Sequence, residues 1–239
     1  MKVFTQKLRL VWGDQVLRNR ILFVLFGFMI FRVLANIPMP GADVAALARL
    51  LSGDGGQLLG FLNIFSGGGF ANLSIALLGV GPYITGSIIM QLMTIMSPKV
   101  KNLYHEEGQA GKMKFSQYSR MLTIPLAIIQ GIGFLLLLQQ QSVIDSFTSF
   151  EMITNVIVIT AGSLLLMWIG ELVSEFGIGN GVSLIIFAGI VAGLPTALKQ
   201  LFFTYDASQI PTLLAFAFVA IVVTLAVVII TEAERPVPI

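Results

Sequence analysis

Long apolar runs separated by short polar connections extend along the whole chain and predict six membrane-spanning helices. A run of about 20 apolar residues is long enough to cross the hydrocarbon core of a bilayer. The runs are continuous and lack the period-two alternation of a membrane β-barrel, so we expect an all-α integral membrane protein. The predicted spans cover residues 21–37, 73–96, 121–138, 152–170, 182–203 and 210–230.

Residues 58–96 are apolar almost throughout but do not fit one clean helix. A short segment, Leu58 to Phe65, runs into Ser66-Gly67-Gly68-Gly69, and the run from Leu73 to Met96 is interrupted by glycine and proline. Such interruptions indicate backbone that leaves helical geometry, which a membrane tolerates only where it is buried in protein or faces a water-filled cavity. We therefore expect this stretch to lie beside a path through the membrane.

Composition excludes several classes of protein. The chain is 56% hydrophobic and 11% charged, against roughly 25% charged residues in soluble domains. It has no cysteine and one histidine, so neither a disulfide framework nor a zinc cluster is expected, and a net charge of +2 gives no argument for nucleic-acid binding. The glycine clusters at 66–69 and 177–181 lack the lysine or the preceding strand of nucleotide-binding motifs. Glu171 and Glu175 are interpreted as solvated carboxylates at the membrane edge, and we expect no cofactor and no enzymatic activity.

Basic residues predict the orientation of the spans. Eleven of the 14 Lys and Arg residues lie in residues 1–20, in the connection 97–120, which we predict to be a polar loop, and after the sixth span, all on one side of a six-span topology. Because cytoplasmic loops carry the excess of Lys and Arg, the N-terminus is expected in the cytoplasm. Residues 1–20 form either an amphipathic interfacial helix or a solvated basic tail. Residues 204–239 are predicted to hold the sixth span and the start of a cytoplasmic loop.

Two groups of residues allow both a structural and a functional interpretation. The basic side chains of the connection 97–120 either determine topology, which the sequence favours modestly, or dock a cytosolic partner; they are Lys99, Lys101, Lys112, Lys114 and Arg120. Arg32, inside the first span, is interpreted as an anchor that reaches the interface rather than as a transport residue. Val80 and Ile84 share a helix face, as do Val182 and Ile186. An ordinary packing role would be the default for such pairs, but both pairs adjoin glycine-rich breaks.

Four segments carry a resemblance to a known family. They are FRVLANIPMPG (31–41), NIFSGGGFANLSIALLGVGPYITGSIIMQL (63–92), EEGQAGKMKFSQYSR (106–120) and MWIGELVSEFGIGNGVSLIIFAGIVAGLP (167–195). On these segments the chain resembles the SecY family, the channel-forming subunits of the bacterial protein-conducting translocon. The resemblance implies the first half, residues 21–203, and the sixth span of a ten-helix channel built as an inverted repeat. We expect this stretch to be truncated relative to the family and unable to translocate by itself.

The resemblance also implies roles for individual residues. An aliphatic pore ring would include Val80, Ile84, Val182 and Ile186. A plug half-helix over residues 58–70 would include Leu58, Phe61, Leu62, Ile64, Phe65, Gly67, Gly68 and Gly69. A lateral gate helix would present Ile88, Gln91 and Leu92, and the five basic residues of the connection 97–120 would contact cytoplasmic partners.

The implied function is passage of unfolded polypeptide across, and insertion into, the bacterial cytoplasmic (inner) membrane. The implied partners are SecE and SecG in the membrane, the SecA motor ATPase, the ribosome, signal sequences, nascent polypeptides and lipids. One alternative is half of a secondary transporter, which should carry ionisable residues deep in several spans; Arg32 is the single example found. The other is a non-conducting assembly fragment of the translocon.

Overall fold

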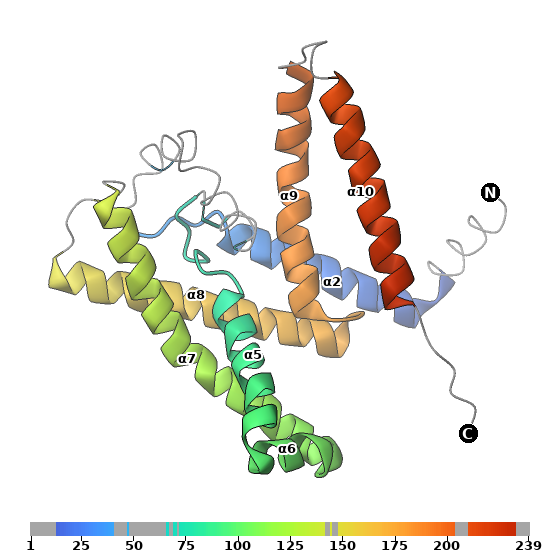
Figure 1. The fold of residues 1–239 in the computed structure, drawn as a ribbon. Helices are drawn as coiled ribbons and strands as arrows, with labels where there is room; N and C mark the ends of the chain where they lie inside the picture. The colour runs from blue at the N-terminus through green and yellow to red at the C-terminus, as the bar shows by residue number, and fades with distance from the viewer. Residues whose placement is uncertain are drawn as a thin grey trace, which may run out of the picture. The chain divides into compact units, whose positions relative to one another are not determined.

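The computed structural model describes seven helices. It describes residues 13–40, 47, 66, 69–70, 72–141, 144, 148–203 and 210–232, with backbone alone at 196–198 and 200–202. Residues Met1–Gly193 form one compact unit and Leu194–Ile239 a second. The helices are α2 (Gln15–Leu34), α5 (Gly81–Met96), α6 (Pro98–His105), α7 (Gly108–Gln140), α8 (Ser149–Phe176), α9 (Gly181–Phe203) and α10 (Ile210–Thr231) (Figure 1).

A helix lies over each predicted span. By length and composition, three helices among the described residues could cross a membrane: α7, α8 and α10. The first thirteen residues of α9 belong to the first unit, and the second unit holds the rest of α9 together with α10, none of whose described residues is buried. The all-helical class is confirmed, whereas the count of six spans remains a prediction.

Two predicted boundaries are wrong. The second predicted span, 73–96, is helical only from Gly81, because Leu73 to Val80 runs as consecutive turns. The helix starts there because Pro82 has no N–H to lose in the first turn and its fixed φ suits a helix N-terminus. The connection 97–120, predicted as a polar loop, is instead mostly helical: α6 and the first turns of α7 occupy it.

The helical hairpin of α6 and α7 is tightly closed. At Gly111 a side-chain Cβ would overlap the carbonyl oxygen of Leu103, and the rings of Tyr104 and Phe115 lie 4.8 Å apart. Gly108, with φ of +60°, makes the turn between the two helices in a conformation that glycine adopts without strain. The polar connection therefore has a defined shape rather than that of an extended loop.

The non-helical segment 72–80 lies in the core of the first unit. Leu73, Ser74 and Ala76 are fully buried. The segment pairs with the chain beyond α2, where Met39 N donates to Leu73 O (2.8 Å) and Ile75 N donates to Ile37 O (3.0 Å).

Hydrogen bonds within segment 72–80 and from α8 satisfy more of its backbone. Gly79 N donates to Ala76 O (2.8 Å), and the hydroxyl of Ser163 in α8 donates to Gly79 O (2.8 Å). Irregular backbone can persist among apolar helices because such partners replace water.

Two clusters of buried side chains flank segment 72–80. One joins Leu73, Leu77 and Leu78 to α7 and α8, and the other joins Ala76 and Val80 to α2, α8 and α9. Helix α2 packs against α8, and α5 and α8 both pack against α7 (Figure 1). Gly162 lets α8 approach the backbone of segment 72–80 closely, because a Cβ at this position would overlap the carbonyl oxygen of Ile75. The segment is thus held between helices on both sides.

Candidate functional site

The four aliphatic residues singled out in the sequence come together in the structure. Val80, at the N-terminal end of α5, and Ile84, one turn further along, belong to the same packed cluster as Val182 and Ile186 of α9. Val80 is 1% exposed, whereas the other three are half-buried. Residues about a hundred positions apart in sequence therefore form one aliphatic surface.

A cleft of about 360 Å³ opens beside this aliphatic surface. It lies between α5, the end of α8 and the start of α9, and it has both apolar and polar walls. Its lining comprises Tyr83, Ile84, Ser87, Ile88, Gln91, Glu171, Ser174, Asn180, Val182, Ser183 and Ile186. The cleft thus joins three of the four predicted pore positions to six neutral polar side chains and one carboxylate.

The turn from α8 into α9 positions one wall of the cleft. The hydroxyl of Ser174 donates to Gly170 O (2.9 Å) and accepts from Gly181 N (2.7 Å). The side-chain oxygen of Asn180 accepts from Ser183 N (3.1 Å), which satisfies a free N–H in the first turn of α9. These hydrogen bonds fix the position at which α9 begins. They therefore also fix the position of Val182, in the first turn of α9, on the aliphatic surface.

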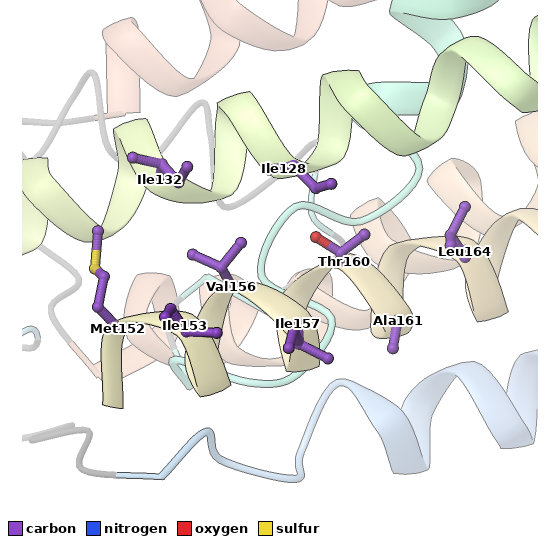
Figure 2. A pocket seen from close by; sticks show the side chains of 9 residues that line it. All are labelled: Ile128, Ile132, Met152, Ile153, Val156, Ile157, Thr160, Ala161 and Leu164. Carbon is purple, nitrogen blue, oxygen red and sulfur yellow. The ribbon is translucent and has the colours of Figure 1, made fainter. Parts of the chain in front are cut away.

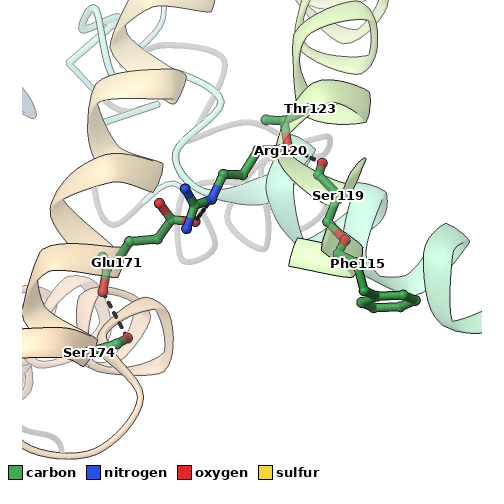
Figure 3. Close-up of polar contacts among 7 residues, drawn as sticks. Phe115, Ser119, Arg120, Thr123, Glu171 and Ser174 are labelled. Carbon is green, nitrogen blue, oxygen red and sulfur yellow. Dashed lines mark hydrogen bonds and ion pairs between the residues drawn. The ribbon is translucent and has the colours of Figure 1, made fainter. Parts of the chain in front are cut away.

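An ion pair joins α7 to α8 at the edge of the cleft. Arg120 Nε lies 2.5 Å from Glu171 Oε1, and their side chains are 46% and 17% exposed (Figure 3). Glu171 is therefore not the freely solvated carboxylate that the sequence suggested. The expected topology placed both residues at the same membrane face but did not predict that they pair.

Small and hydroxylated residues form the nearby crossing of α5 and α7. The hydroxyl of Ser119 donates to Phe115 O (3.1 Å), and that of Thr123 donates to Ser119 O (2.9 Å), so both buried side chains are satisfied within α7 (Figure 3). Gly86 of α5 faces them, and a Cβ there would lie 3.1 Å from Ser119 O. Close approach through small residues is typical of helix pairs in membranes.

The structure describes all three residues assigned to the lateral gate but only one of the residues named for the plug. Ile88 and Gln91 line the same cleft as the pore positions, whereas Leu92 is 54% exposed and lies outside its lining. Of the plug residues, Gly69 is described: it is buried, and Gly69 O accepts from Ser74 N (2.9 Å). The other residues named for the plug lie outside the described residues; they are Leu58, Phe61, Leu62, Ile64, Phe65, Gly67 and Gly68.

The predicted basic docking residues lie along the hairpin of α6 and α7. Lys99 and Lys101 are on α6, Lys112, Lys114 and Arg120 are on α7, and all five are exposed. Lys114 Nζ lies 3.2 Å from a carboxylate oxygen of Glu107, with both side chains about half exposed. Such an exposed pair contributes little to stability. Because all five basic side chains are exposed, the hairpin of α6 and α7 presents positive charge on its surface.

A second hollow is almost purely apolar and was not predicted from the sequence. It measures about 720 Å³ and lies between α7 and α8, where Ile128 and Ile132 face Val156 and Thr160 (Figure 2). Its aliphatic walls suit hydrocarbon rather than a polar ligand.

Comparisons with known proteins agree with the resemblance seen in the sequence. A family model described as SecY matches residues 74–239. The protein translocase subunit SecY of Pseudomonas aeruginosa is 40% identical over 225 residues, covering 93% of this chain and 51% of the relative. The subunit of the same name from Escherichia coli K12 is 44% identical over 189 residues, covering 77% of this chain and 42% of the relative. The chain thus spans about half the length of the curated relatives it matches.

The fold also has a solved counterpart. The structure titled "Sec61 in the Canine ribosome-channel complex from the endoplasmic reticulum" matches with a TM-score of 0.58 and 18% sequence identity. The match covers 93% of this chain and 49% of that chain, and at this identity it is a likeness of fold. With the family model covering most of the sequence, the chain belongs to the SecY family.

Proposed function

We propose that this chain forms one side of a protein-conducting channel that passes unfolded polypeptide across, and releases it into, the bacterial cytoplasmic membrane. The observation that carries this proposal is the meeting of Val80 and Ile84 with Val182 and Ile186 beside an open cleft. Membership of the SecY family supports it. The function is transport, with no chemical step assigned to the chain.

The chemistry of the aliphatic surface suits such a channel. Val and Ile side chains offer a hydrated ion no hydrogen bonds, so a narrow constriction lined by them loses its water and blocks ions. An extended polypeptide, partly apolar and flexible, can still pass. The polar groups of the adjoining cleft can solvate its main chain before and after the constriction.

Finer parts of the proposal concern the surrounding elements. In it, residues 58–70 seal the pore as a plug, and Ile88, Gln91 and Leu92 stand on the gate helix through which apolar segments leave. Lys99, Lys101, Lys112, Lys114 and Arg120 contact a cytoplasmic motor or ribosome, which supplies the energy. The N-terminus lies in the cytoplasm, and SecE, SecG and the remaining half of the family's architecture complete the channel.

Ion leak through the complete channel containing this chain tests the proposal. Ile84 is half-buried and lines the cleft, so Ile84→Asp places a charge at the constriction without a fully buried carboxylate. We expect Ile84→Asp to raise ion flux into vesicles, and Ile84→Leu, which keeps the site apolar, to leave it unchanged. Equal ion flux in the wild type and in Ile84→Asp, with both channels assembled, would show that the aliphatic cluster merely packs.

A further inference from the structure

Among the residues that the structure describes, the lining of the cleft beside the aliphatic surface has one acidic side chain and no basic one. Of its eleven lining residues, Glu171 alone has a carboxyl side chain, and the others are neutral polar or aliphatic. Its side chain is 17% exposed. In such a partly dry setting a carboxylate attracts cations more strongly than it would in bulk water.

The neutral polar groups at the α8–α9 turn are committed to the backbone. Ser174 bonds to Gly170 and Gly181, and the side-chain oxygen of Asn180 accepts from Ser183 N. Glu171 differs, because a carboxylate has about four acceptor positions on its two oxygens. It can hold one cation and still accept another.

The cation already present approaches Glu171 from outside the cleft. Arg120 comes from α7 and is not part of the cleft lining. Figure 3 shows its side chain extending from α7 toward the carboxylate on α8. Arg120 therefore compensates the charge of Glu171 and leaves the cavity itself open.

On these grounds, and resting on the proposed function, we infer that Glu171 binds basic side chains of a polypeptide in the channel, in competition with Arg120. A segment in contact with Ile84 and Val182 shares the cleft with Glu171. A lysine or arginine in that segment gains a carboxylate partner, whereas an acidic residue meets a like charge. Basic positions should dwell in the cleft longer than neutral ones.

Disulfide trapping in the complete channel containing this chain tests the inference. These 239 residues contain no cysteine, so Ser183→Cys introduces their single thiol, on the cleft wall. Stalled substrates carry one cysteine flanked by Lys, Gln or Glu, and the measured quantity is the ratio of trapped Lys-flanked to Gln-flanked substrate. Comparing this ratio between channel variants cancels the effect of the flanking residue on thiol reactivity.

The variants separate a binding role from a structural one. Glu171→Gln should lower the Lys-to-Gln ratio about fivefold, the effect of roughly 1 kcal/mol, and Arg120→Gln should raise it. Glu175→Gln is the matched control, since Glu175 is exposed on the same helix and outside the cleft lining. The exchange Arg120→Glu with Glu171→Arg should reverse the preference toward Glu-flanked substrate.

Other results would overturn the inference. If Glu171→Gln and Arg120→Gln give the same ratio as Glu175→Gln while trapping remains efficient, the ion pair is structural and the channel proposal stands. If no substrate is trapped at residue 183 in any variant, polypeptide does not occupy the cleft, and the proposed function fails together with the inference.

Discussion

Replacement of Gly162 by alanine should destabilise the first unit strongly. A Cβ there would overlap the carbonyl oxygen of Ile75 and lie 2.8 Å from its carbonyl carbon. Ordinary contact between carbon atoms needs about 3.5 Å, so the carbonyl carbon alone requires α8 and segment 72–80 to separate by ~0.7 Å, and the overlapping oxygen requires more. The atoms in the way are backbone, which cannot rotate aside as a side chain does.

This separation also affects the neighbouring hydrogen bond. Ser163 follows Gly162 and donates to Gly79 O at 2.8 Å; a shift of about 0.7 Å would bring that distance to the limit of hydrogen bonding. Overpacking costs about 1–3 kcal/mol, and a buried carbonyl left without its donor adds about 1–3 kcal/mol. Allowing for partial relaxation, we expect a loss of about 2–4 kcal/mol.

Unfolding of the purified chain in mixed detergent micelles, followed by helical circular dichroism, measures this loss. Gly133→Ala is the matched control, since Gly133 lies inside α7 with no atom within 4 Å of a built Cβ. It should be neutral or stabilising by up to about 1 kcal/mol. Equal stability of the Gly162→Ala and Gly133→Ala variants would refute the close contact between α8 and segment 72–80.

Two further substitutions test how helix ends are fixed. Gly181→Ala should disrupt the corner between α8 and α9, because a Cβ would overlap Gly170 O; reduced thermal stability is expected, with Gly193→Ala, which has open space, as the control. Thr148→Ala removes the hydroxyl that donates to a carboxylate oxygen of Glu151 in the capping box, while the backbone N–H of residue 148, which donates to the same oxygen (2.8 Å), remains. It should cost about 1 kcal/mol in the same unfolding assay, and no change would mean that packing alone fixes the start of α8.

Apolar runs located the helices well but could not separate helix from buried irregular backbone. Residues 73–80 are as apolar as α5, yet they form turns whose partners come from α2's C-terminal extension and from α8. Hydrophobicity alone does not distinguish an apolar helix such as α5, where Ile95 and Met96 are exposed, from irregular backbone buried in the core. The local signals were Gly79, with φ of +56°, and Pro82 in the first turn of α5.

The polar composition of residues 97–120 led to the opposite error, in which a helical segment was predicted to be irregular. Residues 97–120 were expected as a loop because they are charged, but water accommodates a polar helix as readily as a loop. Pro98 is a start signal for α6, and Gly108, with φ of +60°, marks the turn between α6 and α7, so local signals were present. The ion pair of Arg120 with Glu171 was beyond sequence reasoning, since it requires knowing that α7 and α8 lie side by side.

The late start of α5 bears directly on the proposed constriction. Val80 precedes the helix, so its position is set by the turn segment, which α8 holds through Gly162 and Ser163. The position of Ile84 depends on that of Val80, because Ile84 N donates to Val80 O (3.1 Å) at the start of α5. Two of the four aliphatic positions thus depend on a backbone contact that neither residue makes. A substitution at Gly162 should therefore raise ion leak as well as lower stability, whereas loss of the exposed Lys114–Glu107 pair should change neither.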